Sequence, residues 1–208
     1  MARFKGFVGP SYTSASRIAA YDRSVNWMPE RIVSGTGEAA YVLYPPPGFE
    51  ALGGMTGLDS PGRGIFASED GGAWFVSGNT FYQATSTNRG TVSNTENAPV
   101  FIVSNGEGGR QLLVNADTQT YAYDLDTFTF TNVSGSTQAT SIGFLNSYGL
   151  RLDPSRSEVS ISALLDFTTW GAGDIFQRND AADKWQRLLV NGKEVWLFGG
   201  ATTSVYYN

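Results

Sequence analysis

The chain has 208 residues and a formal net charge of −5, and it contains neither Cys nor His. These absences exclude disulfides, thiolate metal sites and the Ser–His and Cys–His nucleophile pairs, so catalysis would have to use carboxylates, Lys, Tyr or a group supplied by the substrate. With 41% hydrophobic and 16% charged residues the composition is that of a globular protein. Its 25 Gly and 13% aromatic residues favour an all-β fold.

Charge is unevenly distributed along the chain. Residues 1–60 hold five basic and five acidic residues, whereas residues 61–208 hold nine basic and 14 acidic ones. No basic stripe indicates a nucleic-acid grip. The start, "MARFKGFVGP", has no apolar core of a signal peptide, and no apolar run is long enough to span a membrane.

The first sixty residues differ from the rest and predict an extended N-terminal arm. Pro29 and the triplet at 45–47 lack backbone donors and favour polyproline II. We expect one strand from Ala40 to Leu43 and one helical turn from Arg17 to Asp22. The apolar residues of the arm suggest that it docks, either on its own body or on a neighbour: they are Trp27, Met28, Tyr41, Tyr44 and Phe49.

From Gly62 onward a unit recurs, in which an apolar run, a turn and an alternating strand follow one another. The units contain "GGAWFVSGNTFYQAT", "GRQLLVNADTQTYAYDLDT", "YGLRLDPSRSEVSISAL" and "GKEVWLFGGATTSVYYN". Each follows a shorter apolar stretch: "GIFAS", "APVFIVS", "TSIGFLN" or "WQRLLVN". Trp74, Leu112, Leu150 and Val195 mark the repeat, at spacings of 38, 38 and 45 residues. About four strands in each forty residues indicate propeller blades, with a β-sandwich as the alternative.

The sequence therefore predicts an all-β, partial β-propeller of about three to four blades over residues 61–208, with the arm over residues 1–60. Its sheet interiors are expected to hold Trp74, Leu112, Leu113, Trp196 and Phe198. In the last hairpin, Val195 and Leu197 alternate along one strand, and Val205 and Tyr207 along the next. Because this unit lacks its outer strands, we expect blades beyond Asn208 and an aggregation-prone 208-residue piece.

Several motifs could carry chemistry. "SEDGGAW", Ser68 to Trp74, resembles the Asp-box turn of sialidase-like propellers but is one residue short. A sialidase site would need converging arginines, and no spacing singles out a triad among Arg63, Arg89, Arg110, Arg151 and Arg187. A glycosidase would need two paired carboxylates, for which the candidates are Glu158, Asp166 and Asp174. We expect the Asp-box-like stretch to be a plain hairpin turn and the three acids to be solvated loop charges.

The remaining polar motifs also predict turns. Asp117, Asp124 and Asp126 lack the Gly and Glu of an EF-hand loop. "SNGEGG" and "LFGGATT" are not followed by the helix of a phosphate-binding loop. The sequon at Asn132 has meaning only in a secreted protein. The sequence thus predicts no catalytic residue, cofactor or metal site.

Two longer stretches resemble a known family. The first is "SVNWMPE" followed by "YVLYPPPGFEAL", and the second is "LLDFTTWGAGDIFQRNDAADKWQRLLVNGKEVWLFGGATTSVYYN". They are similar to the tail-hub or nozzle proteins of short-tailed phages, also called packaged-DNA stabilisation proteins. Members of that family continue past the Tyr-Tyr-Asn position, so the resemblance implies the N-terminal part of a longer polypeptide.

The resemblance implies a non-enzymatic structural protein located in the virion tail. Such proteins are propellers that assemble as a ring of copies, with six as the expected number, below the tail adaptor protein. They meet a tail needle or plug, or fibre and spike proteins. Genomic DNA passes through the channel without specific binding, and no membrane is involved. The alternative is a secreted sialidase-like or glycan-binding propeller.

Overall fold

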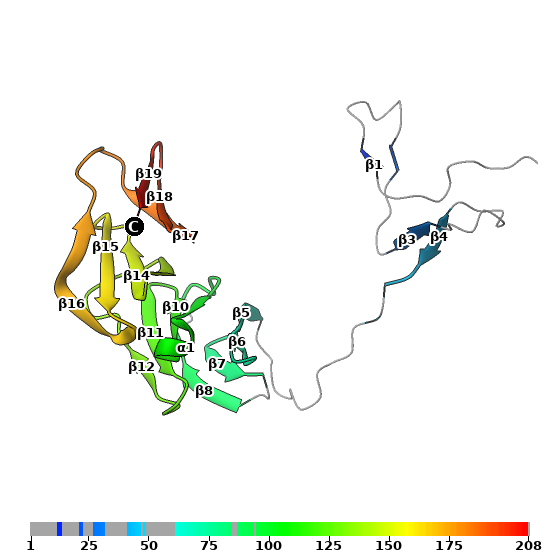
Figure 1. Cartoon of the computed structure of the whole chain (residues 1–208), viewed down its shortest axis with the longest axis horizontal. Coiled ribbons are helices and arrows are strands. Elements are labelled where there is room, and N and C mark those ends of the chain that lie inside the picture. The colour runs from blue at the N-terminus through cyan, green and yellow to red at the C-terminus, as the bar shows by residue number, and fades with distance from the viewer. Residues whose placement is uncertain are drawn as a thin grey trace, which may run out of the picture. The chain divides into compact units, whose positions relative to one another are not determined.

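The computed structural model describes residues 12–13, 21–22, 27–31, 41–46, 48, 61–84, 87–93 and 95–207. The chain forms two compact units, Met1–Leu52 and Gly53–Asn208 (Figure 1). Each unit is described by itself. Among the described residues, no helix has the length and apolar character needed to cross a membrane.

The described residues of the first unit form two two-stranded antiparallel sheets. β1 (Tyr12–Thr13) pairs with β2 (Tyr21–Asp22), and β3 (Met28–Arg31) pairs with β4 (Tyr41–Tyr44). The strand expected at Ala40–Leu43 is confirmed as β4, one residue further along. The helical turn expected from Arg17 to Asp22 is wrong for Tyr21 and Asp22, which form β2. Residues 17–20 of the expected turn lie outside the described residues. Pro29 is accommodated within β3 because every strand of a two-stranded sheet is an edge strand.

The second unit is a partial β-propeller of four antiparallel sheets that follow chain order, coloured from teal to red in Figure 1. The first sheet has the strands β5 (Gly62–Ala67), β6 (Ala73–Ser77), β7 (Thr80–Gln83) and β8 (Thr87–Thr91). The second has β9 (Phe101–Ser104), β10 (Gln111–Ala116), β11 (Gln119–Asp124) and β12 (Phe130–Asn132). One helical turn, α1 (Gly106–Gly109), connects β9 to β10 where a turn was expected.

The third and fourth sheets complete the series. The third contains β13 (Ser141–Leu145), β14 (Tyr148–Asp153), β15 (Glu158–Ala163) and the long β16 (Asp166–Gln177). The fourth has three described strands, β17 (Trp185–Asn191), β18 (Glu194–Gly199) and β19 (Thr203–Tyr207). The 12 residues of β16 and the loop after it account for the wider last spacing of the repeat.

The four repeat markers lie in equivalent strands, β6, β10, β14 and β18, each of which is the second strand of its sheet. The turns also follow the sequence expectation. Gly78 in the first hairpin and Asp117 in the second have positive φ angles of 56° and 54°. In the third hairpin, Asp153 Oδ1 accepts a hydrogen bond from the Ser155 amide at 2.9 Å, which is an Asx turn.

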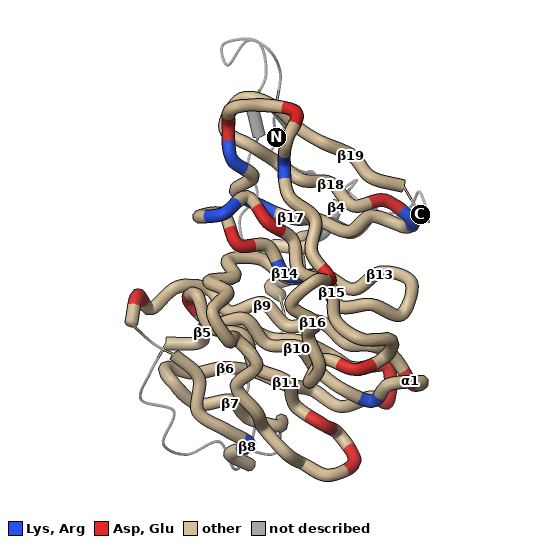
Figure 2. Tube along the Cα trace, turned by 90° about the vertical axis from the view of Figure 1, so that its left-hand side faces the viewer, with Lys and Arg blue, Asp and Glu red and all other residues tan. Residues whose placement is uncertain are grey.

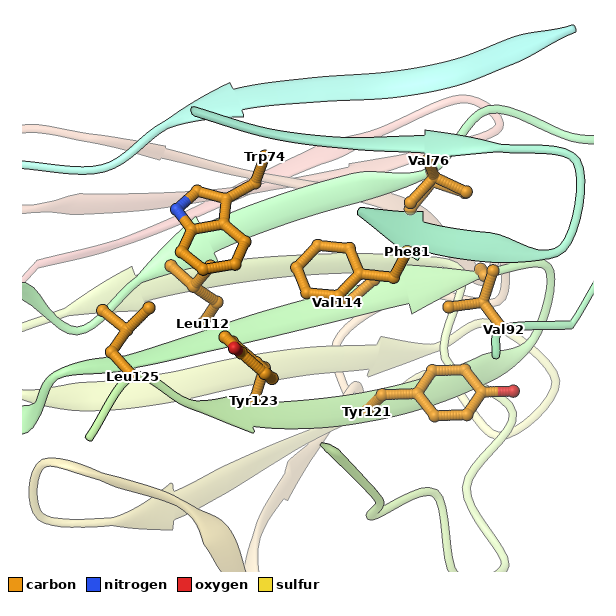
Figure 3. Packing of buried hydrophobic residues seen from close by; sticks show 11 residues of the cluster. Trp74, Val76, Phe81, Val92, Leu112, Val114, Tyr121, Tyr123 and Leu125 are labelled. Carbon is orange, nitrogen blue, oxygen red and sulfur yellow. The ribbon is translucent and has the colours of Figure 1, made fainter. Parts of the chain in front are cut away.

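The first and second sheets pack through a dense aromatic and aliphatic layer (Figure 3). Trp74 and Phe81 of the first sheet are stacked, with ring centroids 5.6 Å apart, and Trp74 lies 5.1 Å from Tyr123 of the second. Leu112 and Val114 of β10 are fully buried in the same layer. Because residues alternate along a strand, Leu113 points to the other face of the second sheet.

Two further layers join the remaining sheets. Leu113 and Ala122 of the second sheet pack with Ile142 and Phe167 of the third. The opposite face of the third sheet packs on the fourth, through Leu150, Leu152, Val159, Trp185, Leu188, Val195 and Leu197. Three apolar layers therefore hold four sheets together.

The sequence prediction for the interior is confirmed in part. Trp74, Leu112 and Leu113 are at most 2% exposed. Trp196 and Phe198 were expected inside but are only half-buried, because β18 turns Val195 and Leu197 toward the third sheet instead. In β19, which pairs with β18, Val205 lies opposite Trp196. Val205 therefore shares the outer face of Trp196 and not the buried face of Leu197.

Charged residues gather in the turns and loops, notably around α1 and beyond β11, whereas most strand positions are uncharged (Figure 2). Asp183 is one such loop residue. Its carboxylate accepts hydrogen bonds from the Ala201 and Thr202 amides at 2.9 and 3.1 Å and from the Thr202 hydroxyl. Arg178 lies 3.1 Å from the same carboxylate. These contacts, the Ala201 amide foremost, lower the pKa of Asp183 to about 2.

The buried layers predict large costs of truncation. Leu112→Ala removes a fully buried side chain between two sheets, so the free energy of unfolding should fall by about 2–5 kcal/mol. Leu164→Ala is the matched control, because Leu164 is 61% exposed, and it should change stability by less than about 0.5 kcal/mol. Urea denaturation of the two variants measures both values. Equal losses would contradict the described packing.

The turn at Asp183 predicts a specific pH dependence. Because the pKa is lowered on folding, the ionised carboxylate stabilises the protein above its unfolded pKa of about 3.9, and this contribution is lost as the pH falls toward about 2. Asp183→Asn should therefore lower the melting temperature at pH 7 and differ less from the parent protein at pH 2. Thermal melts followed by circular dichroism check this. A difference independent of pH would argue against the hydrogen-bonded carboxylate.

Candidate functional site

A central groove lies in the described part of the second unit. It is lined by the first strands of all four sheets and has a volume of about 520 Å³. Phe66, Phe101, Phe144 and Leu189 represent β5, β9, β13 and β17 in its wall. Phe101 and Leu189 are 45% and 53% exposed. The groove therefore presents an apolar surface that is open to solvent.

Glycine leaves room for side chains between two of the innermost strands. A Cβ placed on Gly143 of β13 would lie 2.6 Å from Cγ2 of Val190 on β17, so a larger residue at position 143 would have to displace the Val190 side chain. The two charged residues of the lining are both engaged. Arg187 donates a hydrogen bond to the carbonyl of Thr140 at 2.7 Å, and Glu69 accepts one from the Ser104 hydroxyl at 3.3 Å.

A second apolar groove of about 430 Å³ lies between the third and fourth sheets. Its lining includes Leu145, Tyr148 and Phe176 from the third sheet and Tyr206 and Tyr207 from β19. Neither groove was predicted from the sequence. The sequence indicated the grooves only through aromatic residues at strand ends. Such residues are equally common in a core, so they do not predict a groove.

The Asp-box-like turn between β5 and β6 has a structural role. The Ser68 hydroxyl donates to Asp70 at 2.5 Å and accepts a hydrogen bond from the Trp74 indole at 2.9 Å. The Gly72 amide donates to the same Asp70 carboxylate at 3.1 Å. These contacts fix the turn and the orientation of Trp74 in the core. The prediction of a turn is confirmed.

The five arginines considered for a sialidase site do not converge. Arg63 is buried and ion-paired with Asp117 at 2.8 Å, with both side chains at most 3% exposed. Its guanidinium also donates to three backbone carbonyls, those of Gly78, Ser93 and Ala98. Arg63 thus ties the first sheet to the β10–β11 turn of the second.

The other arginines are held in separate places. Arg151 is buried between the second and third sheets, where it donates to the Val133 carbonyl and lies 4.2 Å from the ring centroid of Trp170. Burial lowers the pKa of Arg151 to about 10, although nearby Glu158 and Asp153 oppose this shift. Arg89 lies over Phe128, and Arg110 forms an exposed pair with Asp126. Of the five, Arg187 alone lines the central groove.

The glycosidase candidates are also kept apart. Glu158 pairs with Gln177 at one end of the β15–β16 ladder, while Asp166 pairs with Ala163 at the other. This places the two acids roughly 16 Å apart along the strand, beyond the separation of about 5–9.5 Å that glycosidases use. Asp174 is exposed on β16.

Asp166 instead shapes its own turn. It accepts hydrogen bonds from the amide and hydroxyl of Thr168 at 2.8 and 2.6 Å. Burial raises the pKa of Asp166, but these hydrogen bonds outweigh it and leave the pKa below its usual value. Glu158 accepts a hydrogen bond from Gln177 at 2.7 Å. The expectation of a solvated loop charge is wrong for Glu158, which is 6% exposed and lies in β15. The carboxylates of Asp166 and Glu158 therefore serve the local fold.

The acidic residues near the second hairpin are likewise structural. Asp117 accepts hydrogen bonds from the Ser93 hydroxyl and the Thr95 amide. Asp124 caps the next turn through the amides of Asp126 and Thr127. Within the described ranges no group of acids is arranged to hold a metal ion. The sequon residue Asn132 is exposed and donates to Gln119.

Comparisons with known proteins show the fold and no more. No protein-family model and no curated protein matches the chain. The chain is similar to the extracellular domain of BT4673 from B. thetaiotaomicron, described as a hybrid two component system, at 14% identity, 83% of this chain, 23% of that one and a TM-score of 0.50.

Two other solved structures resemble the chain. One is virginiamycin B lyase from Staphylococcus aureus, at 12% identity, 88% of this chain, 63% of that one and a TM-score of 0.48. The other is YCF48 bound to a peptide, at 15% identity, 77% of this chain, 51% of that one and a TM-score of 0.48. The chain spans less than two thirds of the length of each of these structures.

The buried ion pair leads to a matched test. Arg63→Met leaves the carboxylate of Asp117 buried without its partner, so the free energy of unfolding should fall by about 3–5 kcal/mol. Arg110→Met breaks the exposed pair with Asp126, whose attraction is screened by solvent, so it should cost far less stability than Arg63→Met. Denaturant titration compares the two variants. Similar small losses would show that Arg63 is not the tie between the first two sheets.

Proposed function

We propose that the chain is a virion structural protein of a short-tailed phage, forming part of the ring-shaped distal tail channel. The proposal is supported by the position, in the structure, of the stretch that resembles the tail-hub family. In "LLDFTTW", Asp166 fixes the turn, Phe167 is fully buried, and the Trp170 indole donates to the Phe167 carbonyl at 2.7 Å. The motif residues build the joint between the second and third sheets.

Other residues of the family-like stretch also connect neighbouring sheets. Phe167 donates its amide to Gln111 of the second sheet at 2.7 Å, and Trp185 donates its amide to Ser157 of the third sheet at 3.0 Å. Asp183 and Thr202 hold the last described turn together. A family-like stretch whose residues maintain the architecture fits a structural protein better than a hydrolase.

The proposed partners are further copies in a ring, with six as the expected number, the tail adaptor protein above, and a needle, plug, fibre or spike protein. Genomic DNA would pass through the channel without specific binding. The excess of acidic residues over 61–208 supports this last point. Phosphate groups are repelled by like charge within about 10 Å at 0.1 M salt.

Immunogold electron microscopy tests the proposal. An antibody raised against residues 61–208 should label one end of the particles produced by the genome that encodes the chain. Labelling should persist after the DNA has been ejected, because a tail component stays with the particle. Detection of the chain only in a secreted fraction free of particles would refute the virion role.

A glycan-binding propeller is the second candidate, and the exposed Phe101 in the central groove favours it. Aromatic rings in a groove can stack on sugar rings. A glycan array with the parent protein and Phe101→Ser decides between the candidates. Binding that is lost in the variant would support the alternative, as would hydrolysis of a sialoside that depends on Glu158 or Asp166.

The N-terminal arm, residues 1–60, gives a further prediction. Trp27, Met28 and Tyr44 are about half exposed, which suits docking through apolar anchors. We expect the arm to contact a neighbouring copy or the adaptor. Deleting residues 1–60 should leave the melting temperature of the propeller unchanged but reduce its incorporation into tails. Normal incorporation of the shortened chain, measured by quantitative blotting of purified particles, would contradict this.

A further inference from the structure

Strand edges without a partner line the central groove. β9 and β13 are each the terminal strand of a four-stranded sheet, so one edge of each has no strand partner among the described residues. Both strands contribute to the groove wall, and both belong to sheets whose two faces pack on described neighbours. An extended peptide can add to such an edge through main-chain hydrogen bonds.

The groove wall beside these edges is apolar. Phe66, Val103 and Phe144 contribute to it while they also pack on the internal layers. Phe101, the first residue of β9, is 45% exposed although both faces of its sheet are covered. The groove volume of about 520 Å³ lies within the range of about 300–1,000 Å³ that is usual for ligand pockets. The wall therefore suits the apolar side chains of a bound peptide.

Opposite charges lie at the two ends of the groove. Arg187 donates to the carbonyl of Thr140, the residue before β13, and shares a small pocket with Phe101. Arg187 thus lies where β9 and β13 begin. Glu69 accepts a hydrogen bond from Ser104, the last residue of β9, so it lies where that strand ends.

The small pocket has a volume of about 130 Å³ and adjoins the groove at Arg187. Of the residues lining the two cavities, Arg187 alone is basic, and it has no ion-pair partner in the described part of the chain. Asp117 in the small pocket is held by Arg63, and Glu96 is exposed. Because a guanidinium pairs well with a carboxylate, Arg187 is available to an acidic group of a ligand.

We propose that the central groove binds an extended peptide segment, with apolar side chains against Phe101 and Phe144 and an acidic residue at Arg187. Main-chain hydrogen bonds to the edge of β9 or β13 supply affinity. Charge complementarity at Arg187 and at Glu69, where a basic residue fits, sets the direction of the segment. The proposal goes beyond the virion role and does not depend on it.

A peptide matches this groove better than a sugar does. A sugar needs polar partners for its hydroxyl groups, but the serine hydroxyls of the groove are already engaged. Ser104 donates to Glu69, and Ser141 accepts the Leu188 amide at 2.9 Å. The unpaired strand edges, in contrast, match the repeating donors and acceptors of an extended backbone.

A synthetic peptide array tests the proposal with the full 208-residue chain. Its members are capped hexapeptides with Leu, Val or Phe at the four central positions and Asp, Asn or Lys at either end. We expect the strongest binding from members with Asp at one end and Lys at the other. Fluorescence anisotropy of the best labelled member should give a saturable curve, and its Asn-for-Asp analogue should bind at least about fivefold more weakly.

Variants of the protein locate the binding site. Arg187→Met should weaken the Asp-ended peptide at least about fivefold and leave its Asn analogue unchanged. Glu96→Gln should strengthen the Asp-ended peptide, because it removes a like charge. Phe101→Ser should weaken both peptides. Arg156→Met is the control, because Arg156 lies in the β14–β15 turn outside both cavities, and circular dichroism melts confirm that all variants fold.

Three results would overturn the proposal. The first is an array on which no peptide gives saturable binding. The second is peptide binding that Arg187→Met and Phe101→Ser leave unchanged, which would place the site elsewhere. The third is binding of sugars alone, lost in Phe101→Ser, which would support the glycan-binding candidate. The first two results leave the labelling of virions unaffected, so they are distinguishable from failure of the proposed function.

Discussion

The structure depends on one constraint, which is that each sheet in the middle of the propeller is apolar on both faces. In β10, Leu112 faces the first sheet and Leu113 faces the third, and both are fully buried. Such a sheet cannot be stable alone, since either face would be exposed to water. The sheets must therefore stack, and the three apolar layers set the order, the spacing and the strand register of the whole unit.

Polar contacts then fix how one sheet meets the next. Arg63 ties the first sheet to the second, Gln111 accepts the Phe167 amide from the third, and Ser141 accepts the Leu188 amide from the fourth. Each contact is directional and buried, so it selects one relative placement of two apolar surfaces that could otherwise slide. Among the residues that first suggested catalysis, Arg63 and Arg151 serve this purpose, whereas Glu158 and Asp166 hold contacts within the third sheet.

The described surface has several apolar regions. The central groove and the groove between the third and fourth sheets are apolar, and stacked aromatic pairs lie on the first sheet, Phe75 with Tyr82, and on the fourth, Trp196 with Phe198. Surfaces of this kind suit assembly with other sheets and chains, because apolar contact needs shape and area rather than reactive groups. This chemistry agrees with the proposed place of the protein in a multi-chain particle.

The sequence by itself determined the local elements. Period-two alternation and turn residues with defined conformations placed the four repeats, the hairpins and strand β4, because these depend on neighbours along the chain. It also supplied Trp74, Leu112 and Leu113 as interior residues.

Only the tertiary structure decided which face of the last sheet is covered. Alternation shows that Val195 and Trp196 point in opposite directions, but either direction could be inward until the third sheet is in place. The same reason applies to the candidate site: whether Glu158 meets Asp166, or Arg63 meets a groove, depends on contacts between distant segments that no spacing in the sequence encodes.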